Sequence, residues 1–108
     1  MRITALIVTI AAAAATTATA QPGDRLSDVD YMQAARCRGL AASEALGAVD
    51  TKAIDAMLKQ QGNGRAAFIA DKADELRNNA ARSAKRADGY TKEKLVAERD
   101  GVCKRFLG

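Results

Sequence analysis

The chain has 108 residues, of which 17 are Lys or Arg and 13 are Asp or Glu, and it contains neither His nor Trp. This length accommodates one domain, and the moderate charge together with a hydrophobic fraction of 48% excludes a disordered chain. Without His the chain lacks the commonest metal ligand and the usual general base at neutral pH. The composition therefore predicts a protein that is not an enzyme and that uses no metal or other cofactor.

Residues 1–20 have the pattern of a cleavable signal peptide. A basic start is followed by an apolar run over 3–15, and the sequence Ala-Thr-Ala at 18–20 fits the small-residue site of signal peptidase. A transmembrane helix is the alternative, but the apolar run is too short to cross about 30 Å of hydrocarbon, and no basic cluster follows it. We expect cleavage before Gln21.

Removal of residues 1–20 on export is expected to leave a mature chain that begins at Gln21. Residues 21–26, which include a Pro-Gly pair, are expected to form a flexible segment, and residues 27–108 a single helical domain. The protein is expected to be periplasmic or secreted, with no stable membrane insertion after the signal peptide is removed.

Cys37 and Cys103 are the two cysteines of the chain. An isolated pair in an oxidising compartment normally forms a disulfide. The spacing of the two residues excludes a Cys-x-x-Cys redox motif, and two thiolates without His do not complete a tetrahedral zinc site. We therefore expect a structural disulfide, with the two Cα atoms about 4.4–6.8 Å apart and both sulfur atoms screened from solvent.

The residues after the predicted signal peptide consist mainly of good helix formers, and no segment alternates with a period of two. Turn residues interrupt them at 47–49, 62–64 and 88–90. The pattern predicts an all-α fold with helices over 27–46, 50–61, 65–87 and 91–107. Ser27 is the expected N-cap of the first helix.

The third predicted helix has the clearest apolar stripe, which is formed mostly by small residues. Its members are Ile69, Ala73, Leu76, Ala80, Ala84 and Ala87. Small residues allow a neighbouring helix to approach closely, although each contact buries little area. Short connections favour an up-down bundle of four helices, in which the first and last are antiparallel neighbours linked by the disulfide.

Arg36 and Arg99 are predicted to lie on the apolar faces of the first and last helices. In one interpretation their stems pack on apolar surface while each guanidinium reaches solvent or a carboxylate such as Glu44. In the other, the two arginines form an anion or ion-pair site between these helices, near the disulfide. The amphipathic character of arginine favours the first interpretation.

Three further patterns are weaker candidates. Carboxylates at 71, 74 and 75 share a helix but are expected to be exposed, so no burial would separate their pKa values. The Gly-Asn-Gly-Arg loop at 62–65 lacks the preceding strand and the Lys of a phosphate loop. Residues 28–30 resemble the start of a calcium loop, but the required Gly and Glu do not follow.

The charge is distributed unevenly along the chain. Residues 65–108 carry eleven basic and seven acidic residues, whereas 21–64 carry five and six. A basic half is suited to an anionic surface. Nucleic acid is not an expected partner, because the protein is exported and no aromatic residues are interleaved to stack on bases. A solvated basic face is the simpler interpretation.

The segments Ala-Arg-Cys-Arg-Gly-Leu-Ala-Ala at 35–42 and Glu-Arg-Asp-Gly-Val-Cys at 98–103 flank the predicted domain. This layout resembles small exported two-cysteine helical proteins of Gram-negative Proteobacteria, most of which have no assigned function. The resemblance covers the layout only and brings no catalytic residue. Because no nucleophile–base pair, metal set or cofactor motif is found in the sequence, we expect a non-enzymatic interaction or envelope-associated protein with a protein or envelope partner. A chaperone-like periplasmic stress protein is the alternative, because such proteins share the size, the export signal and the single long-range disulfide.

Overall fold

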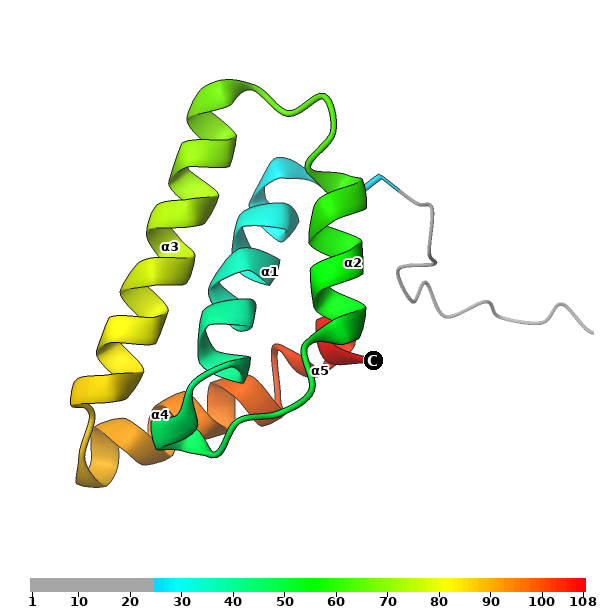
Figure 1. Ribbon diagram of the computed structural model, residues 1–108. Helices are drawn as coiled ribbons and strands as arrows, with labels where there is room; N and C mark the ends of the chain where they lie inside the picture. Colours follow the sequence, from blue (N-terminus) through cyan, green and yellow to red (C-terminus); the bar gives the residue numbers. More distant parts are fainter. Residues whose placement is uncertain (1–24) are drawn as a thin grey trace, which may run out of the picture.

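The computed structural model describes residues 25–108, and the predicted signal peptide with its cleavage site lies outside the described residues. The described part is helical throughout and contains no strand, which confirms the all-α prediction (Figure 1). Its elements are the helices α1 (Asp28–Ala41), α2 (Lys52–Gln61), α3 (Ala67–Arg86), α4 (Gly89–Asp100) and α5 (Lys104–Leu107), with the 3-10 turn η1 (Glu44–Leu46).

The first three long helices alternate in direction, so that α1 and α3 run parallel and α2 runs opposite to both (Figure 1). Helix α4 does not lie alongside α1 as an up-down bundle requires. It passes below the C-terminal end of α1 and crosses both α1 and α3 steeply. The bundle arrangement expected from the sequence therefore describes α1 to α3, but not α4.

The predicted helix over 91–107 is interrupted, which explains the different course of the last segment. At Gly101 the backbone leaves the helical region, with φ −103° and ψ −89°. The amide of Cys103 then donates to the carbonyl oxygen of Glu98 at 3.0 Å, closing a turn. After this turn the chain leaves the direction of α4, α5 packs against α2, and Cys103 lies between two helices rather than inside one (Figure 1).

The first helix is also shorter than predicted, because it ends at Ala41 rather than at residue 46. Ser43 has an extended backbone, and the amide of Val49 donates to the carbonyl oxygen of Ala41 at 2.9 Å. The chain thus folds back on the end of α1, and this places Leu46 in the core. The predicted cap at Ser27 is confirmed, since its hydroxyl accepts from the amide of Asp30 at 3.1 Å.

Close packing of α1 against α3 forms the centre of the fold. Ile69, Ala73, Ala80 and Ala84 of the predicted stripe are buried. On the α1 side, Gly39 lies so close to α3 that an added Cβ would overlap the carbonyl oxygen of Arg77 and come within 3.0 Å of the Ala80 Cβ. Small residues on both helices therefore set their separation.

The apolar core extends from this contact toward α2, α4 and α5. Leu40 and Ile54 are its largest fully buried residues. Leu26 also belongs to the core, and its amide donates to Gln61 Oε1 at 2.9 Å. The packed structure thus includes Leu26, one residue before the domain boundary predicted from the sequence.

Candidate functional site

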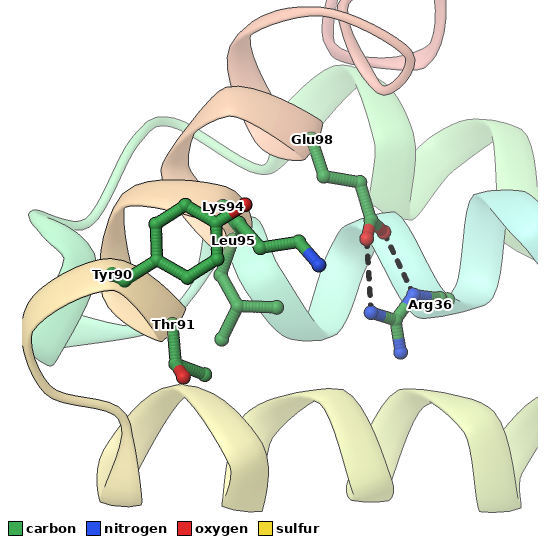
Figure 2. A pocket seen from close by; sticks show the side chains of 6 residues that line it. All are labelled: Arg36, Tyr90, Thr91, Lys94, Leu95 and Glu98. Atoms are coloured by element: carbon green, nitrogen blue, oxygen red, sulfur yellow. Dashed lines mark hydrogen bonds and ion pairs between the residues drawn. The ribbon is translucent and has the colours of Figure 1, made fainter.

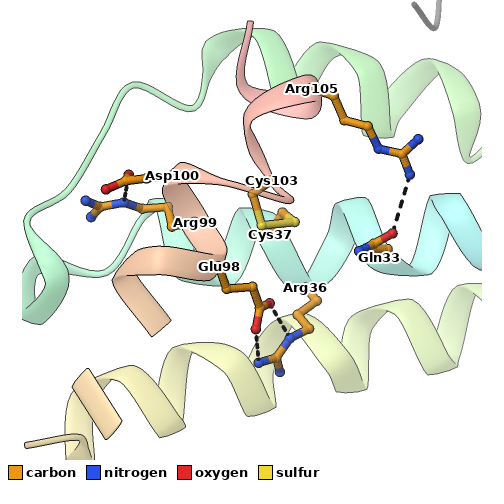
Figure 3. The surroundings of a disulfide bond; sticks show 8 residues. All are labelled: Gln33, Arg36, Cys37, Glu98, Arg99, Asp100, Cys103 and Arg105. Carbon is orange, nitrogen blue, oxygen red and sulfur yellow. Dashed lines mark hydrogen bonds and ion pairs between the residues drawn. A yellow bond between two sulfur atoms is a disulfide. The ribbon is translucent and has the colours of Figure 1, made fainter. Parts of the chain in front are cut away.

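The predicted disulfide between Cys37 and Cys103 is present and joins the middle of α1 to the turn after α4 (Figure 3). The two Cα atoms lie 5.4 Å apart, within the expected range. Both residues are fully buried. The bridge therefore fixes the C-terminal end of α4 against α1 and holds the side chains next to it in a defined arrangement.

Arg36, which precedes Cys37, forms a two-point ion pair with α4. Its Nε and Nη2 donate to the two carboxylate oxygens of Glu98 at 2.7 and 2.9 Å (Figure 3). The hydrogen bond to Glu98 raises the pKa of the Arg36 guanidinium further above its usual value, against the effect of partial burial. Glu98, rather than Glu44, is thus the carboxylate that pairs with Arg36.

Arg99 has different partners, although it follows Glu98 directly. Its Nη1 donates to the carbonyl oxygens of Leu46 and Gly47 at 2.7 and 2.6 Å, and its Nε donates to Asp100 at 3.0 Å. Figure 3 shows the Arg99 and Arg36 side chains leaving α4 and α1 in different directions. The structure therefore does not bring the two arginines together into one anion site.

The buried position of Arg99 predicts a structural role. Arg99→Met keeps the apolar stem but leaves two carbonyl oxygens of the folded-back loop without their donor, and is expected to lower the free energy of unfolding by about 1–3 kcal/mol. Urea denaturation measures the change. Arg105→Met is the control, because Arg105 pairs with Asp30 on the surface and should matter by less than about 1 kcal/mol. Equal effects of the two variants would contradict this role of Arg99.

A pocket of about 340 Å³ opens between α1 and α4 beside the Arg36–Glu98 pair (Figure 2). It is lined by Arg36, Tyr90, Thr91, Lys94, Leu95 and Glu98. In α4, positions 94 and 95 each lie three or four residues from both 91 and 98, so the four residues share one face of the helix. The pocket therefore combines two cations, a carboxylate, a hydroxyl group and apolar surface.

A charged side chain and an aromatic side chain of this pocket lie close together. The Lys94 ammonium lies 5.6 Å from the centre of the Tyr90 ring, within the range of a cation–π contact. The Tyr90 residue is 75% exposed, whereas Leu95 is buried. This arrangement offers positive charge and an apolar surface to the same small volume, which suits the binding of an organic anion.

Tyr90, Thr91 and Lys94 were not among the site residues expected from the sequence. The spacing of Thr91, Lys94 and Glu98 does place them on one helix face. The sequence carries no sign that this face lies against Arg36, because that depends on the steep crossing of α4. Only the Arg36 half of the pocket could be singled out in advance.

Arg65 is a further buried arginine, and its partners explain the loop at 62–65. Its side chain is 3% exposed and donates to Asp28 at 2.7 Å, to the Leu26 carbonyl at 2.7 Å and to the Gln61 carbonyl at 2.8 Å. The guanidinium also lies 4.7 Å from the centre of the Tyr31 ring. Arg65 thus ties the start of the fold to the α2–α3 connection and is committed to internal contacts.

The remaining candidates are surface features. Asp74 pairs with Arg77 at 3.2 Å and Glu75 with Lys72 at 3.5 Å, in exposed positions on α3. Within residues 25–108 no group of three or more His, Cys, Asp or Glu could hold a metal ion. In the same part of the chain, no helix has both the length and the apolar character to cross a membrane.

No protein-family model, curated protein or solved structure matches this chain.

Proposed function

We propose that this protein acts after export, in the periplasm or outside the cell, as a non-enzymatic interaction or envelope-associated protein. The observation that carries the proposal is the pocket between α1 and α4, in which Arg36 and Lys94 lie beside an exposed aromatic ring. The buried disulfide supports the location, because disulfides persist in oxidising compartments. The layout of the sequence, with one Cys in the first helix and one near the end of the chain, resembles that of small exported two-cysteine proteins and also supports this location.

The chemistry of the pocket supports binding rather than catalysis. Arginine and lysine side chains donate hydrogen bonds and supply positive charge, and the tyrosine ring supplies apolar surface. General acid–base catalysis works best with a group that titrates near the working pH, and the sequence contains no His. The two interacting carboxylate oxygens of Glu98 are already engaged by Arg36.

Export is tested by expressing the full sequence in a Gram-negative host. We expect protein recovered from the periplasmic fraction to begin at Gln21 and to contain no free thiol. Mass spectrometry of the intact protein, with and without a thiol-blocking reagent, measures both properties. Recovery of uncleaved chain from the cytoplasm, with both thiols free, would contradict the proposed location.

The binding role is tested by capture of partners from periplasmic extract after chemical cross-linking. We expect wild-type protein and a Lys92→Glu variant to retain the same partners, and a Lys94→Glu variant to lose them. Lys92 is the matched control because it is an exposed lysine of the same helix that does not line the pocket. Equal capture by both variants, or no reproducible partner with wild-type protein, would contradict the proposal.

A chaperone-like periplasmic stress protein is the second candidate function. It is favoured by large apolar residues on the surface, including Val29 and Phe68, which are 68% and 71% exposed. Chaperones bind through apolar surface, so a dye that fluoresces on such surface should bind more strongly as the pH falls toward stress conditions. Dye binding that stays constant from neutral to acidic pH would remove this candidate.

A further inference from the structure

Two cationic groups of the pocket retain donors that no other part of the described chain uses. Arg36 presents Nε and Nη2 to Glu98, whereas its Nη1 has no partner within residues 25–108. Figure 2 shows this third nitrogen turned away from the Glu98 carboxylate, with the Lys94 side chain pointing toward the same ion pair. The Lys94 ammonium contacts the Tyr90 ring and forms no ion pair in the described residues.

The charge of the lining favours a ligand with one negative charge. Arg36 and Lys94 contribute two positive charges and Glu98 one negative charge, so the pocket is positive overall. A monoanion compensates this excess. A second negative charge on the ligand would approach the Glu98 carboxylate and be repelled. The Thr91 hydroxyl adds one neutral donor to the lining.

The apolar part of the lining favours an organic anion over an inorganic one. Leu95 lies between the polar groups, and the exposed Tyr90 ring stands at the edge of the pocket (Figure 2). An aromatic or aliphatic group bound there would cover part of the ring, which a solvated inorganic ion does not. The volume of about 340 Å³ lies at the lower end of the range of small-molecule sites and fits a ring-sized acid.

We propose that the pocket between α1 and α4 binds a monoanionic carboxylate attached to an aromatic or apolar group. The carboxylate lies between Arg36 Nη1 and the Lys94 ammonium, and the apolar group packs on Leu95 and Tyr90. A free aromatic acid and the C-terminal residue of a peptide share this chemistry. The inference rests on the binding role proposed above and specifies the ligand class of the same pocket.

The ligand class is tested by nuclear magnetic resonance titration of isotope-labelled protein, expressed from the full sequence and exported. We expect benzoate to give saturable shifts of the Thr91, Lys94 and Leu95 amides, with a dissociation constant on the order of 1 mM. Acetate, which has only the charge, and benzyl alcohol, which has only the ring, should each bind at least about tenfold more weakly. The affinity of N-acetyl-glycyl-phenylalanine relative to its C-terminal amide shows whether the peptide carboxylate is required. Its affinity relative to benzoate shows whether a peptide carboxylate is bound better than the free acid.

Four variants assign the effect to the pocket. Lys94→Gln and Tyr90→Ala should each weaken benzoate binding by about fivefold or more, whereas Lys92→Gln should leave it unchanged. Glu98→Gln removes the negative charge of the pocket, so binding of the dianion phthalate should improve relative to benzoate. This ratio does not follow from a change in fold stability alone, and so it reports on the role of Glu98 in selecting charge.

Two results would overturn the proposed ligand class. One is a benzoate titration without saturable shifts at the α4 amides, and the other is equal benzoate affinity of the Lys94→Gln and Lys92→Gln variants. If the titration fails while Lys94→Glu still abolishes partner capture, the interaction role stands and the ligand class is wrong. If benzoate binds but capture does not depend on Lys94, the ligand class stands and the pocket is not the surface that holds the partner.

Discussion

Reduction of the Cys37–Cys103 disulfide, or its removal in a Cys37→Ser/Cys103→Ser double variant, is expected to lower the free energy of unfolding by about 2–5 kcal/mol. The bridge joins residues separated by 66 positions, so it restricts the unfolded chain over a long loop. The core that remains contains many alanines and few large residues, with Leu40 and Ile54 the largest that are fully buried. A small domain of this kind depends strongly on a covalent link.

Urea denaturation of the disulfide-bonded protein, with and without a reducing agent, measures this effect. A Cys37→Ala/Cys103→Ala double variant is the matched control, because both positions are fully buried and serine would place two hydroxyl groups there. The alanine variant should lose nearly as much stability as the reduced wild type, and a reducing agent should not change it. A melting temperature of wild-type protein that is insensitive to reduction would contradict the assigned role of the bridge.

The second large effect is expected at Gly39, where Gly39→Ala should lower the free energy of unfolding by about 1–3 kcal/mol. The added methyl group would overlap the carbonyl oxygen of Arg77, and this atom belongs to the backbone of α3, so it can move only if the helices separate. In an open helix the same substitution would instead stabilise by about 1 kcal/mol. The sign of the change therefore reports directly on how closely α1 and α3 pack.

Gly62→Ala is the matched control for this substitution. Gly62 also has right-handed helical dihedral angles, and an added Cβ would lie 3.0 Å from the Leu58 carbonyl oxygen and 3.1 Å from the Tyr31 hydroxyl. The tyrosine side chain can shift, so the loss of stability at Gly62 should be smaller than at Gly39. Increased stability of Gly39→Ala, measured by urea denaturation, would show that the two helices are less closely packed than the structure indicates.

Local sequence patterns predict the helices well and predict their arrangement poorly. The apolar stripe of α3 and the cap at Ser27 can each be recognised from the residues of a single helix. The cap is confirmed, and Ile69, Ala73, Ala80 and Ala84 of the stripe are buried, whereas Leu76 and Ala87 are half-buried. The course of α4 depends on Gly101, which has no distinctive local signal because a glycine can also lie within a helix. The non-helical backbone of Gly101 is followed by the disulfide and by the packing of α5 on α2, and both are contacts between distant residues.

The residues that line the pocket could also be predicted only in part. Arg36 and Arg99 stand out in the sequence because each interrupts an apolar face. Arg36 pairs with a carboxylate, that of Glu98 rather than Glu44, whereas Arg99 Nη1 donates to backbone carbonyl oxygens, which neither interpretation of the sequence includes. Their partners could not be identified, because Glu98 and the loop carbonyls come close only when α4 crosses below α1. Lys94 and Tyr90 are exposed residues in a basic segment, and only the folded structure places them beside Arg36.

The long separation of the two cysteines also determines how the protein responds to proteases. The connections between α1 and α2 and between α2 and α3 both lie inside the loop closed by the bridge. A single cut in either connection therefore leaves two fragments that are still covalently joined. Such a nicked molecule would migrate as one species on a non-reducing gel and as two species after reduction. A protein with this topology can retain its fold after a cleavage that would release part of a domain without the disulfide.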